Sequence, residues 1–407
     1  MPTRRVAITG LGVLCAQGGN CDEFWRSLSR GATGIGPLEA VDASQLRFKN
    51  GAEVRGFVAE RHFDPAKVPL LDRFTQFGLF ASREAIAAAG LTWDASSAER
   101  TAIVTGSALG GQTTEDVAFA DLYYHRKPRV NPLSIPRIMA NALASHISME
   151  FGITGPAFTL STACSSANHA IGLAFWMVRN GLVDVAVTGG SEAPLSLGNL
   201  KAWEAMRVVS PDTCRPFARD RRGMILGEGG AMLVIELLEA ARARGAGIYA
   251  EIAGFGMSSD AYHITQPSVE GPARAMKAAL ADAAMSPEAV GYVNAHGTGT
   301  PTNDPTEARA LYSVFGKRAA GLAVSSTKSM HGHALGAAGA IEAAATALGL
   351  KNGILPPTAN FTEPDPECEL DVIPNMARRA EVDCALSNSF AFGGLNAVLA
   401  FRRWNGS

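Results

Sequence analysis

Cys164 combines a reactive side chain with the surroundings that a nucleophile needs. It lies in the run Thr-Leu-Ser-Thr-Ala-Cys-Ser-Ser-Ala-Asn-His-Ala-Ile-Gly, residues 159–172. An apolar, β-prone stretch precedes the cysteine, and an apolar segment at helical spacing follows it. The pattern predicts a strand, a sharp turn and a helix, with the thiol at the first turn of the helix. Free N–H groups and the positive end of the helix dipole would stabilise a thiolate there.

The alternative for any cysteine is a buried structural thiol. We favour that alternative for Cys15, Cys21, Cys214, Cys368 and Cys384. Cys164 differs because the small residues that flank it leave room for a substrate.

Two histidines lie in turns rich in small residues. His296 belongs to Asn-Ala-His-Gly-Thr-Gly-Thr, residues 294–300, which follows a strand pattern and precedes a helix start. His333 follows a glycine and opens a helix of small residues, residues 334–350. Turns of this kind display an imidazole with little side-chain bulk around it, although a polar loop histidine is the simpler interpretation of His296 taken alone.

Lys328 stands at the end of a strand pattern, inside a run that otherwise lacks charged residues. A lysine is usually a solvated surface residue, but this setting favours a buried one. Its ammonium can donate to a carboxylate, for which Glu307 is the candidate, or to a histidine ring.

A glycine-rich turn, residues 387–396, joins two C-terminal strand patterns. Backbone N–H groups in such a turn can point at an oxyanion. Phe392 precedes two glycines and could act as a movable side chain over a pocket, although a core phenylalanine is commoner.

One cysteine and two histidines on such turns fit acyl-thioester chemistry. The cysteine would carry an acyl group, and two neutral imidazoles would donate hydrogen bonds to the oxygen of an enolate. A hydrolase would need only one histidine with an acidic partner.

Alternating strand and helix patterns must position these residues, and they predict an α/β fold. The predicted strands are 6–9, 101–105, 158–162, 183–188, 231–236, 248–253, 290–294, 322–326, 384–387 and 397–401. The predicted helices are 73–90, 167–180, 237–244, 270–284, 304–315 and 334–350. Residues 5–12 resemble residues 249–256, which indicates an internal duplication with a boundary near residue 247.

Composition narrows the class of protein. The chain has 407 residues, of which 47% are hydrophobic and 18% charged, and its net charge of −2 predicts no attraction to nucleic acid or anionic membrane. Six scattered cysteines without a C-x-x-C pair disfavour a zinc site or a disulfide scaffold and favour a reducing cytoplasm. No signal-peptide core opens the sequence, and the charge-free run 154–178 fits a buried core better than a membrane span. No glycine cluster matches a phosphate-binding loop or a dinucleotide fingerprint.

The chemical runs described above, together with residues 5–12, 215–217 and 223–229, resemble those of the β-ketoacyl-[acyl carrier protein] synthases, condensing enzymes of the thiolase superfamily. The resemblance covers nearly the whole chain. It implies a thiolase-like five-layered αβαβα fold of two similar halves, 1–247 with the nucleophile and 248–407 with the two histidines and the lysine. It also implies an obligate dimer.

The resemblance further implies a reaction cycle. Cys164 takes an acyl chain from the phosphopantetheine of an acyl carrier protein. His296 and His333 then support the decarboxylation of a malonyl unit on a second carrier protein, and the resulting enolate attacks the acyl thioester. The product is a β-ketoacyl-carrier protein two carbons longer, as in fatty acid or type II polyketide elongation. No metal or nucleotide cofactor is implied.

Other roles follow from the same resemblance. Lys328 and Glu307 order the site, and the backbone N–H groups of Cys164 and Phe392 form the oxyanion hole. The implied substrate pocket is lined by Leu109, Trp203, Thr298, Thr300, Phe390 and Gly393. Carrier proteins are acidic, so basic residues near the pocket mouth are expected to dock them; the candidates are Lys67, Arg73 and Arg207.

The chain departs from the family pattern in the last turn, where Ala391 replaces a glycine and Leu395 a threonine. Alanine reaches positive φ less freely than glycine, which bears on the movement of Phe392. His331 is also unusual, and it either contacts the pocket or faces solvent.

The local sequence around these motifs is similar to that of nodulation-type ketosynthases and of polyene-type type II ketosynthases. The partner is therefore a second copy or a chain-length factor, a homologue that lacks the cysteine. Two alternatives remain open. A thiolase would need a second reactive cysteine, for which Cys384 is the candidate, and a non-catalytic chain-length-setting subunit would not need Cys164.

Overall fold

The computed structural model describes residues 4–406 and arranges eleven strands of that range in one mixed sheet. The order is β12-β10-β9-β14-β15-β8-β1-β7-β6-β4-β5. The strands are β1 Val6–Cys15, β4 Thr101–Gly106, β5 Ala157–Leu160, β6 Val185–Glu192, β7 Gly229–Leu237, β8 Ala250–Ser259, β9 Val290–Asn294, β10 Ala323–Ser325, β12 Asp371–Val372, β14 Cys384–Ala391 and β15 Leu395–Arg402. Two short ribbons pair β2 Gly36–Pro37 with β3 Asn50–Gly51 and β11 Ile354–Leu355 with β13 Arg378–Arg379.

The strand order repeats on the two sides of the contact between β1 and β8. On one side β1, β7 and β6 are antiparallel neighbours, and β4 and β5 follow in parallel. On the other side β8, β15 and β14 are antiparallel neighbours, and β9 and β10 follow in parallel. β1 and β8 themselves pair only between residues 6–8 and 250–252. The sheet is thus two similar halves joined by a short contact.

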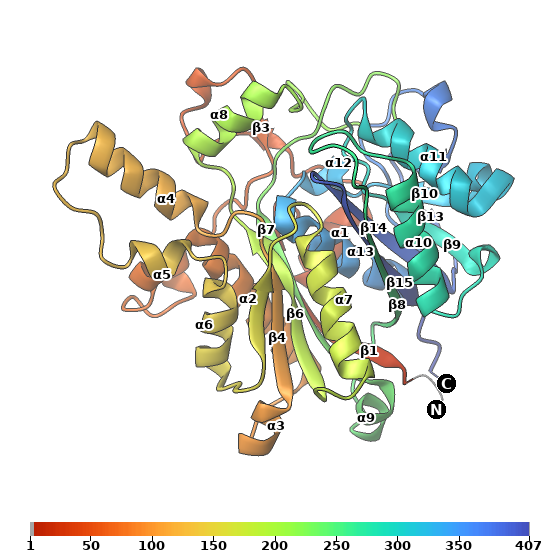
Figure 1. The fold of residues 1–407 in the computed structure, drawn as a ribbon, viewed down its shortest axis with the longest axis horizontal. Coiled ribbons are helices and arrows are strands. Elements are labelled where there is room, and N and C mark those ends of the chain that lie inside the picture. Colours follow the sequence, from red (N-terminus) through yellow and green to blue (C-terminus); the bar gives the residue numbers. More distant parts are fainter. Residues whose placement is uncertain (1–3, 407) are drawn as a thin grey trace.

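Two central helices, α7 (Ser166–Arg179) and α13 (Ala338–Asn352), contact strands of both halves (Figure 1). Helix α2 (Arg73–Ala89) covers β1, β7 and β6, whereas α10 (Glu270–Asp282) covers β8 and β15 with α11 (Asn303–Phe315) beside it. All residues from 338 to 350 are buried because α13 packs against strands of both halves of the sheet. This arrangement confirms the expected five-layered, thiolase-like fold.

Close approach of strand and helix explains the repeated Gly-x-Gly of residues 5–12 and 249–256. A Cβ added to Gly12 would lie 1.9 Å from the carbonyl oxygen of Ala81 in α2. A Cβ added to Gly256 would lie 2.2 Å from the carbonyl oxygen of Ala275 in α10. Each half therefore uses glycine at the same place, to let its outer helix rest on its first strand.

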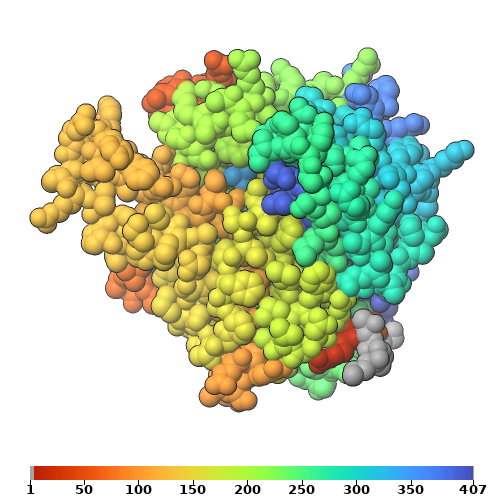
Figure 2. Space-filling view, viewed as in Figure 1, coloured from red at the N-terminus to blue at the C-terminus, as the bar shows by residue number. Residues whose placement is uncertain are grey.

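The other helices are α1 Cys21–Leu28, α3 Ala95–Glu99, α4 Gln112–Phe119, α5 Ser134–Ile138, α6 Ala142–Phe151, α8 Leu197–Met206, α9 Leu238–Ala243 and α12 Lys328–His331. The sequence missed all of these except α9. Residues 112–141, which we call the arm, carry α4 and α5 and project from the body of the molecule (Figures 1 and 2). The helix expected over 334–350 begins later, at Ala338, after a 3-10 turn at Leu335–Ala337.

The charge-free run 154–178 contains β5 and most of α7, the helix between the two half-sheets. Within residues 4–406 no helix has the length and apolar character to cross a membrane.

Candidate active site

Cys164 lies in a tight turn between β5 and α7. Ala163 takes a left-handed backbone conformation with φ of 51°, and the hydroxyl groups of Ser165 and Ser166 donate to the carbonyl oxygens of Thr162 and Ala163, at 2.8 and 2.6 Å. The helix begins at Ser166, so the thiol stands just before its first turn rather than within it. The Cys164 side chain is buried and lines a cavity.

The pKa of Cys164 contradicts the expectation of a thiolate, because the side chain is a protonated thiol at pH 7. Burial raises the pKa of Cys164 to about 11. The positive charge of Lys328 and the backbone N–H groups of Phe392 and of Cys164 itself act in the opposite direction, but they do not outweigh the loss of water. The backbone N–H group of Phe392, a residue far away in sequence, thus lies close enough to the sulfur to favour its ionised form.

His296 and His333 lie next to each other in the cavity lining. Their ring centroids are 5.4 Å apart and the rings are nearly perpendicular. Burial, and next the nearby charge of Lys328, hold the pKa of both imidazoles well below the usual value, so both are neutral at pH 7. Nδ1 of His296 and both ring nitrogens of His333 have no hydrogen-bond partner. Two neutral rings with unused nitrogens are therefore available to a ligand.

Lys328 is fully buried, as its uncharged surroundings indicated, but its expected partner is wrong. Its ammonium donates to the backbone oxygen of His296 at 2.7 Å and to the carboxylate of Glu342. Glu307 instead accepts from the backbone N–H groups of His296 and Gly297, at 2.9 and 2.8 Å. Both carboxylates thus hold the His296 turn, one directly and one through the lysine.

Glu342 was missed by the sequence reasoning, although a signal existed. It is the single charged residue between 338 and 350, a stretch of α13 that is buried throughout. A lone carboxylate in such a helix needs a buried cation as partner. Burial raises the pKa of Glu342, and the Lys328 ammonium opposes that rise.

His331 does not reach the cavity and does not face solvent. It is fully buried, with Nδ1 2.9 Å from the oxygen of Gly332 and Nε2 2.9 Å from Oγ1 of Thr327. Burial lowers the pKa of His331 to about 3. It therefore supports the turn that carries His333 as a neutral ring.

The turn after β14 closes the site from another side. Gly393 and Gly394 have φ of 82° and 69°, whereas Ala391 keeps negative φ at the end of β14. The ring of Phe392 stacks on that of Trp203 from α8, with centroids 6.0 Å apart. Phe390 packs at the edge of the His296 ring, also at 6.0 Å.

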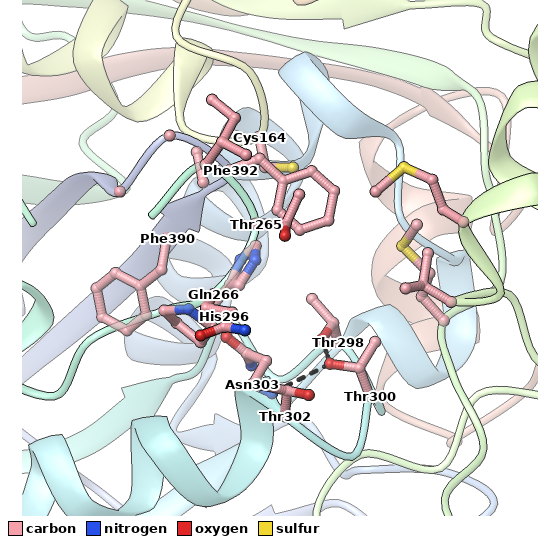
Figure 3. Close-up of a pocket in the computed structure, with 18 of the residues that line it drawn as sticks. Cys164, Thr265, Gln266, His296, Thr298, Thr300, Thr302, Asn303, Phe390 and Phe392 are labelled. Carbon is pink, nitrogen blue, oxygen red and sulfur yellow. Dashed lines mark hydrogen bonds between the residues drawn. The ribbon is translucent and has the colours of Figure 1, made fainter. Parts of the chain in front are cut away.

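These side chains surround a cavity of about 380 Å³. In Figure 3, Cys164 and Phe392 lie at one side of it and Thr298 and Thr300 at the other. The structure brings to it nine of the expected residues: Cys164, Trp203, His296, Thr298, Thr300, His333, Phe390, Phe392 and Gly393. The lining residues that were not expected include Met206, Val208, Met224, Gln266 and Asn303.

Some expected residues lie elsewhere. Leu109 does not line the cavity but packs with Leu200 and Leu335 in the core beneath α8. Of the three basic docking candidates only Arg207 borders the cavity, and Arg73 is paired with Glu228 at 2.6 Å. Lys67 is exposed and does not line the cavity.

The other five cysteines are buried and do not line the cavity, Cys384 included. Across residues 4–406, His, Cys, Asp and Glu side chains form no cluster of three that could hold a metal ion.

Comparison with known proteins gives consistent similarities over the whole chain. The family model "Beta-ketoacyl synthase, N-terminal domain" matches residues 3–241, and "Beta-ketoacyl synthase, C-terminal domain" matches residues 249–362. The chain is 46% identical over 400 residues to "Nodulation protein E" of Rhizobium sp., with 98% of this chain and 99% of that protein covered. It is 41% identical over 408 residues to "3-oxoacyl-[acyl-carrier-protein] synthase 2" of Staphylococcus aureus, covering 98% and 99%.

A solved structure described as "The ishigamide ketosynthase/chain length factor" superimposes with a TM-score of 0.94 at 37% identity. It covers 99% of this chain and 100% of its own.

Proposed function

The chain belongs to the β-ketoacyl synthase family, and on that premise we propose that it catalyses the decarboxylating condensation of an acyl thioester with malonyl-acyl carrier protein. One observation carries the proposal: a single cavity is lined by a cysteine and by two neutral histidines with unpartnered ring nitrogens. The cysteine and the histidines serve the two halves of the reaction.

In the first half, Cys164 gives its thiol proton to water, and its sulfur attacks the carbonyl carbon of an acyl-phosphopantetheine thioester. The oxyanion that forms accepts hydrogen bonds from the N–H groups of Cys164 and Phe392. The carrier thiolate leaves with the electron pair of the broken C–S bond and takes up a proton. The acyl group remains on Cys164.

In the second half, malonyl-carrier protein loses carbon dioxide, and the electron pair of the broken C–C bond forms an enolate. Its oxygen accepts hydrogen bonds from His296 and His333. Each neutral ring carries one N–H group and can therefore donate one such hydrogen bond. The enolate carbon attacks the acyl group, and the sulfur of Cys164 leaves and regains a proton. The product is a β-ketoacyl chain two carbons longer.

Lys328, Glu342 and Glu307 act on the histidine turns rather than on the substrate. The ammonium lies against the backbone oxygen of His296, and Glu307 holds two N–H groups of the same turn. Both interactions keep His296 in place, and the Lys328 charge also disfavours protonation of both rings. We assign them as positioning residues.

The polar lining at Thr298 and Thr300 suits the amides of phosphopantetheine, and the apolar wall at Trp203 and Met206 suits an acyl chain. Arg207 at the cavity edge is the remaining candidate among the predicted contacts to an acidic carrier protein.

The partners are an acyl carrier protein, named as the substrate carrier of the Staphylococcus relative, and a second ketosynthase-like subunit, as in the ishigamide structure. The exposed apolar side chains of the arm and the open edge of β5 support a paired molecule. We propose a homodimer or a heterodimer with a chain-length factor, without nucleic acid or membrane partners, in the cytoplasm.

Apart from the phosphopantetheine of the carrier protein, which belongs to the substrates, the proposed chemistry uses only groups of this chain and needs no cofactor. We also propose that the chain consists of two halves. Residues 1–247 carry Cys164, and residues 248–407 carry the two histidines and Lys328.

The test is mass spectrometry of the purified chain after incubation with acyl-carrier protein and then malonyl-carrier protein. We expect an acyl adduct on Cys164, followed by malonyl-dependent release of carbon dioxide and a product two carbons longer. Cys164→Ala should abolish condensation, and His333→Ala should block the malonyl half while largely preserving acyl transfer. An adduct without carbon dioxide release would instead indicate a thiolase, and no adduct a chain-length-setting subunit.

A further inference from the structure

The ring of His333 is not oriented by any hydrogen bond within residues 4–406. Both of its nitrogens lack a partner there, and the one aromatic ring in contact with it is that of His296. A catalytic histidine is usually held through its second nitrogen, which fixes the tautomer and the direction of the ring. The direction of the His333 ring must therefore come from its backbone and from packing.

Three hydrogen bonds hold the backbone around His333. Its N–H group donates to the oxygen of Ile225 at 2.7 Å, and its oxygen accepts from the N–H group of Gly227 at 3.0 Å. The oxygen of Gly332, on the other edge of the peptide group before His333, lies 2.9 Å from Nδ1 of His331. Gly332 has a φ of 67°, so the chain turns sharply at that point. Of the three contacts, the one with His331 is made by a side chain, so a substitution can remove it by itself.

The surroundings of His331 define its tautomer. A backbone oxygen can only accept a hydrogen bond, so Nδ1 carries the proton and donates to Gly332. Nε2 then accepts from the hydroxyl group of Thr327, at 2.9 Å. Burial lowers the pKa of His331 to about 3, so the ring keeps this neutral form near pH 7. Because Thr327 directly precedes Lys328, the His331 ring joins the turns that carry Lys328 and His333.

We propose that His331 is a positioning residue for the malonyl half of the reaction: its Nδ1–H group holds the peptide group before His333 and so aims the His333 ring at the enolate oxygen. The clause on the enolate rests on the proposed function, because that reaction is what forms one. The hold on the peptide group rests on the geometry alone. His331 then does for His333 what Lys328 and Glu307 do for His296.

The inference separates the two halves of the reaction. Cys164 stands on the turn between β5 and α7, and no hydrogen bond in the described chain joins the His331 side chain to that turn. Acyl transfer to Cys164 should therefore not depend on His331. Malonyl decarboxylation uses His333, and displacing a catalytic group by about 1 Å costs about a hundredfold in rate.

The test compares His331→Asn with His331→Gln. The amide nitrogen of asparagine can take the place of Nδ1 and donate to Gly332, whereas the amide of glutamine reaches the place of Nε2 and satisfies Thr327 alone. We expect His331→Gln to lower the kcat for malonyl-dependent carbon dioxide release by about tenfold to a hundredfold, with the KM for malonyl-carrier protein nearly unchanged. His331→Asn should restore most of that rate, and acyl loading of Cys164 should be the same in both variants.

Controls separate positioning from a purely structural role. Each variant removes one of the two hydrogen bonds of a buried ring, so urea unfolding should show similar losses of stability. A rate that falls equally in both variants, or an unchanged rate in His331→Gln, would therefore overturn the proposal. His146→Gln, at a half-buried histidine outside the cavity, should leave the rate unchanged. If His331→Gln does not fold, His331→Met takes its place with the same expected result, since methionine adapts to its surroundings and has no donor.

Crystal structures of the variants give a readout that needs no activity. We expect the His333 ring of His331→Gln to leave its position, in which its centroid is 5.4 Å from that of His296, and the ring of His331→Asn to keep it. A chain that releases no carbon dioxide but shows this difference keeps the positioning role and loses the proposed reaction. A chain that condenses normally and whose His331→Gln variant releases carbon dioxide at the normal rate keeps the reaction and loses the positioning role.

Discussion

At the residue scale, the site depends on a buried ion pair that does not touch the cavity. Lys328 and Glu342 are both fully buried, and the lysine also binds the backbone of His296. Charges in such a place are tolerated only as a pair, because either one alone would lack compensation for its lost water. The pair thus ties the stability of the fold to the position of His296.

We predict that Glu342→Ala lowers the free energy of unfolding by about 3–5 kcal/mol, because it leaves the Lys328 ammonium buried and unpaired. The combined substitution Lys328→Met with Glu342→Leu should cost less, since no charge then remains. Urea unfolding monitored by circular dichroism measures both. Asp184→Ala, which breaks an exposed pair with Arg100, is the control and should cost at most about 1 kcal/mol. A double variant as unstable as Glu342→Ala would contradict this account.

A second residue-scale prediction concerns the protonation of Cys164. Since its pKa is raised to about 11, the thiolate fraction should increase about tenfold for each pH unit between 7 and 10. The rate of alkylation by iodoacetamide should follow this slope. Lys328→Ala should slow alkylation at each pH, because the ammonium lowers the pKa of the thiol. A rate that levels off near pH 8 would mean that the thiolate already forms near neutrality.

At the scale of the elements, the two halves share a contact between the first strand and the outer helix. Gly12 lies under α2 and Gly256 under α10, in each case with the helix backbone where a Cβ would stand. The duplication seen in the sequence therefore reflects a packing requirement. The same requirement explains why these glycines lie inside strands, where glycine is otherwise unfavourable.

Gly12→Ala and Gly256→Ala should each lower the free energy of unfolding by about 1–3 kcal/mol, because the new methyl group forces the helix away from the strand. Gly247→Ala is the matched control. A Cβ there would meet no atom within 4 Å, so its effect should stay within about 0.5 kcal/mol. Thermal and urea unfolding of the three variants test the prediction, which fails if Gly12→Ala is as stable as Gly247→Ala.

At the scale of the whole molecule, the arm exposes more apolar surface than is usual for a monomeric protein. Its exposed large side chains are Val117, Phe119, Tyr123, Tyr124, Val130, Ile135 and Met139. β5 also ends the sheet with one edge unpaired. Contiguous apolar groups and an open strand edge are features of an interface with another subunit.

We predict that the combined substitution Phe119→Glu with Tyr124→Glu weakens subunit association, since two charges would be buried in the interface. In sedimentation velocity experiments, the variant should sediment more like a monomer at concentrations where the unmodified chain is a dimer. Met376→Glu, at an equally exposed apolar residue outside the arm, should not change sedimentation. If the arm variant sediments like the unmodified chain, the arm is not the interface.

The sequence by itself determined ten strands of the large sheet, six of the helices, the duplicated architecture and the turns that carry Cys164, His296 and His333. These features are local, because short stretches of sequence contain the hydrophobic periodicity and the small residues at strand ends that predict them. Of the seven missed helices, α4, α5 and α8 bury few side chains, so their hydrophobic periodicity is weak.

Only the tertiary structure decided which carboxylate reaches Lys328, whether Cys164 is ionised and whether Leu109 lines the cavity. Glu307 and Glu342 are chemically equal candidates, and the packing of α13 between the two half-sheets selects Glu342. The local argument from the helix dipole predicted a thiolate, but the pKa depends on how much water the whole fold removes. Desolvation and pairing are properties of the assembled core, so no stretch of sequence contains them.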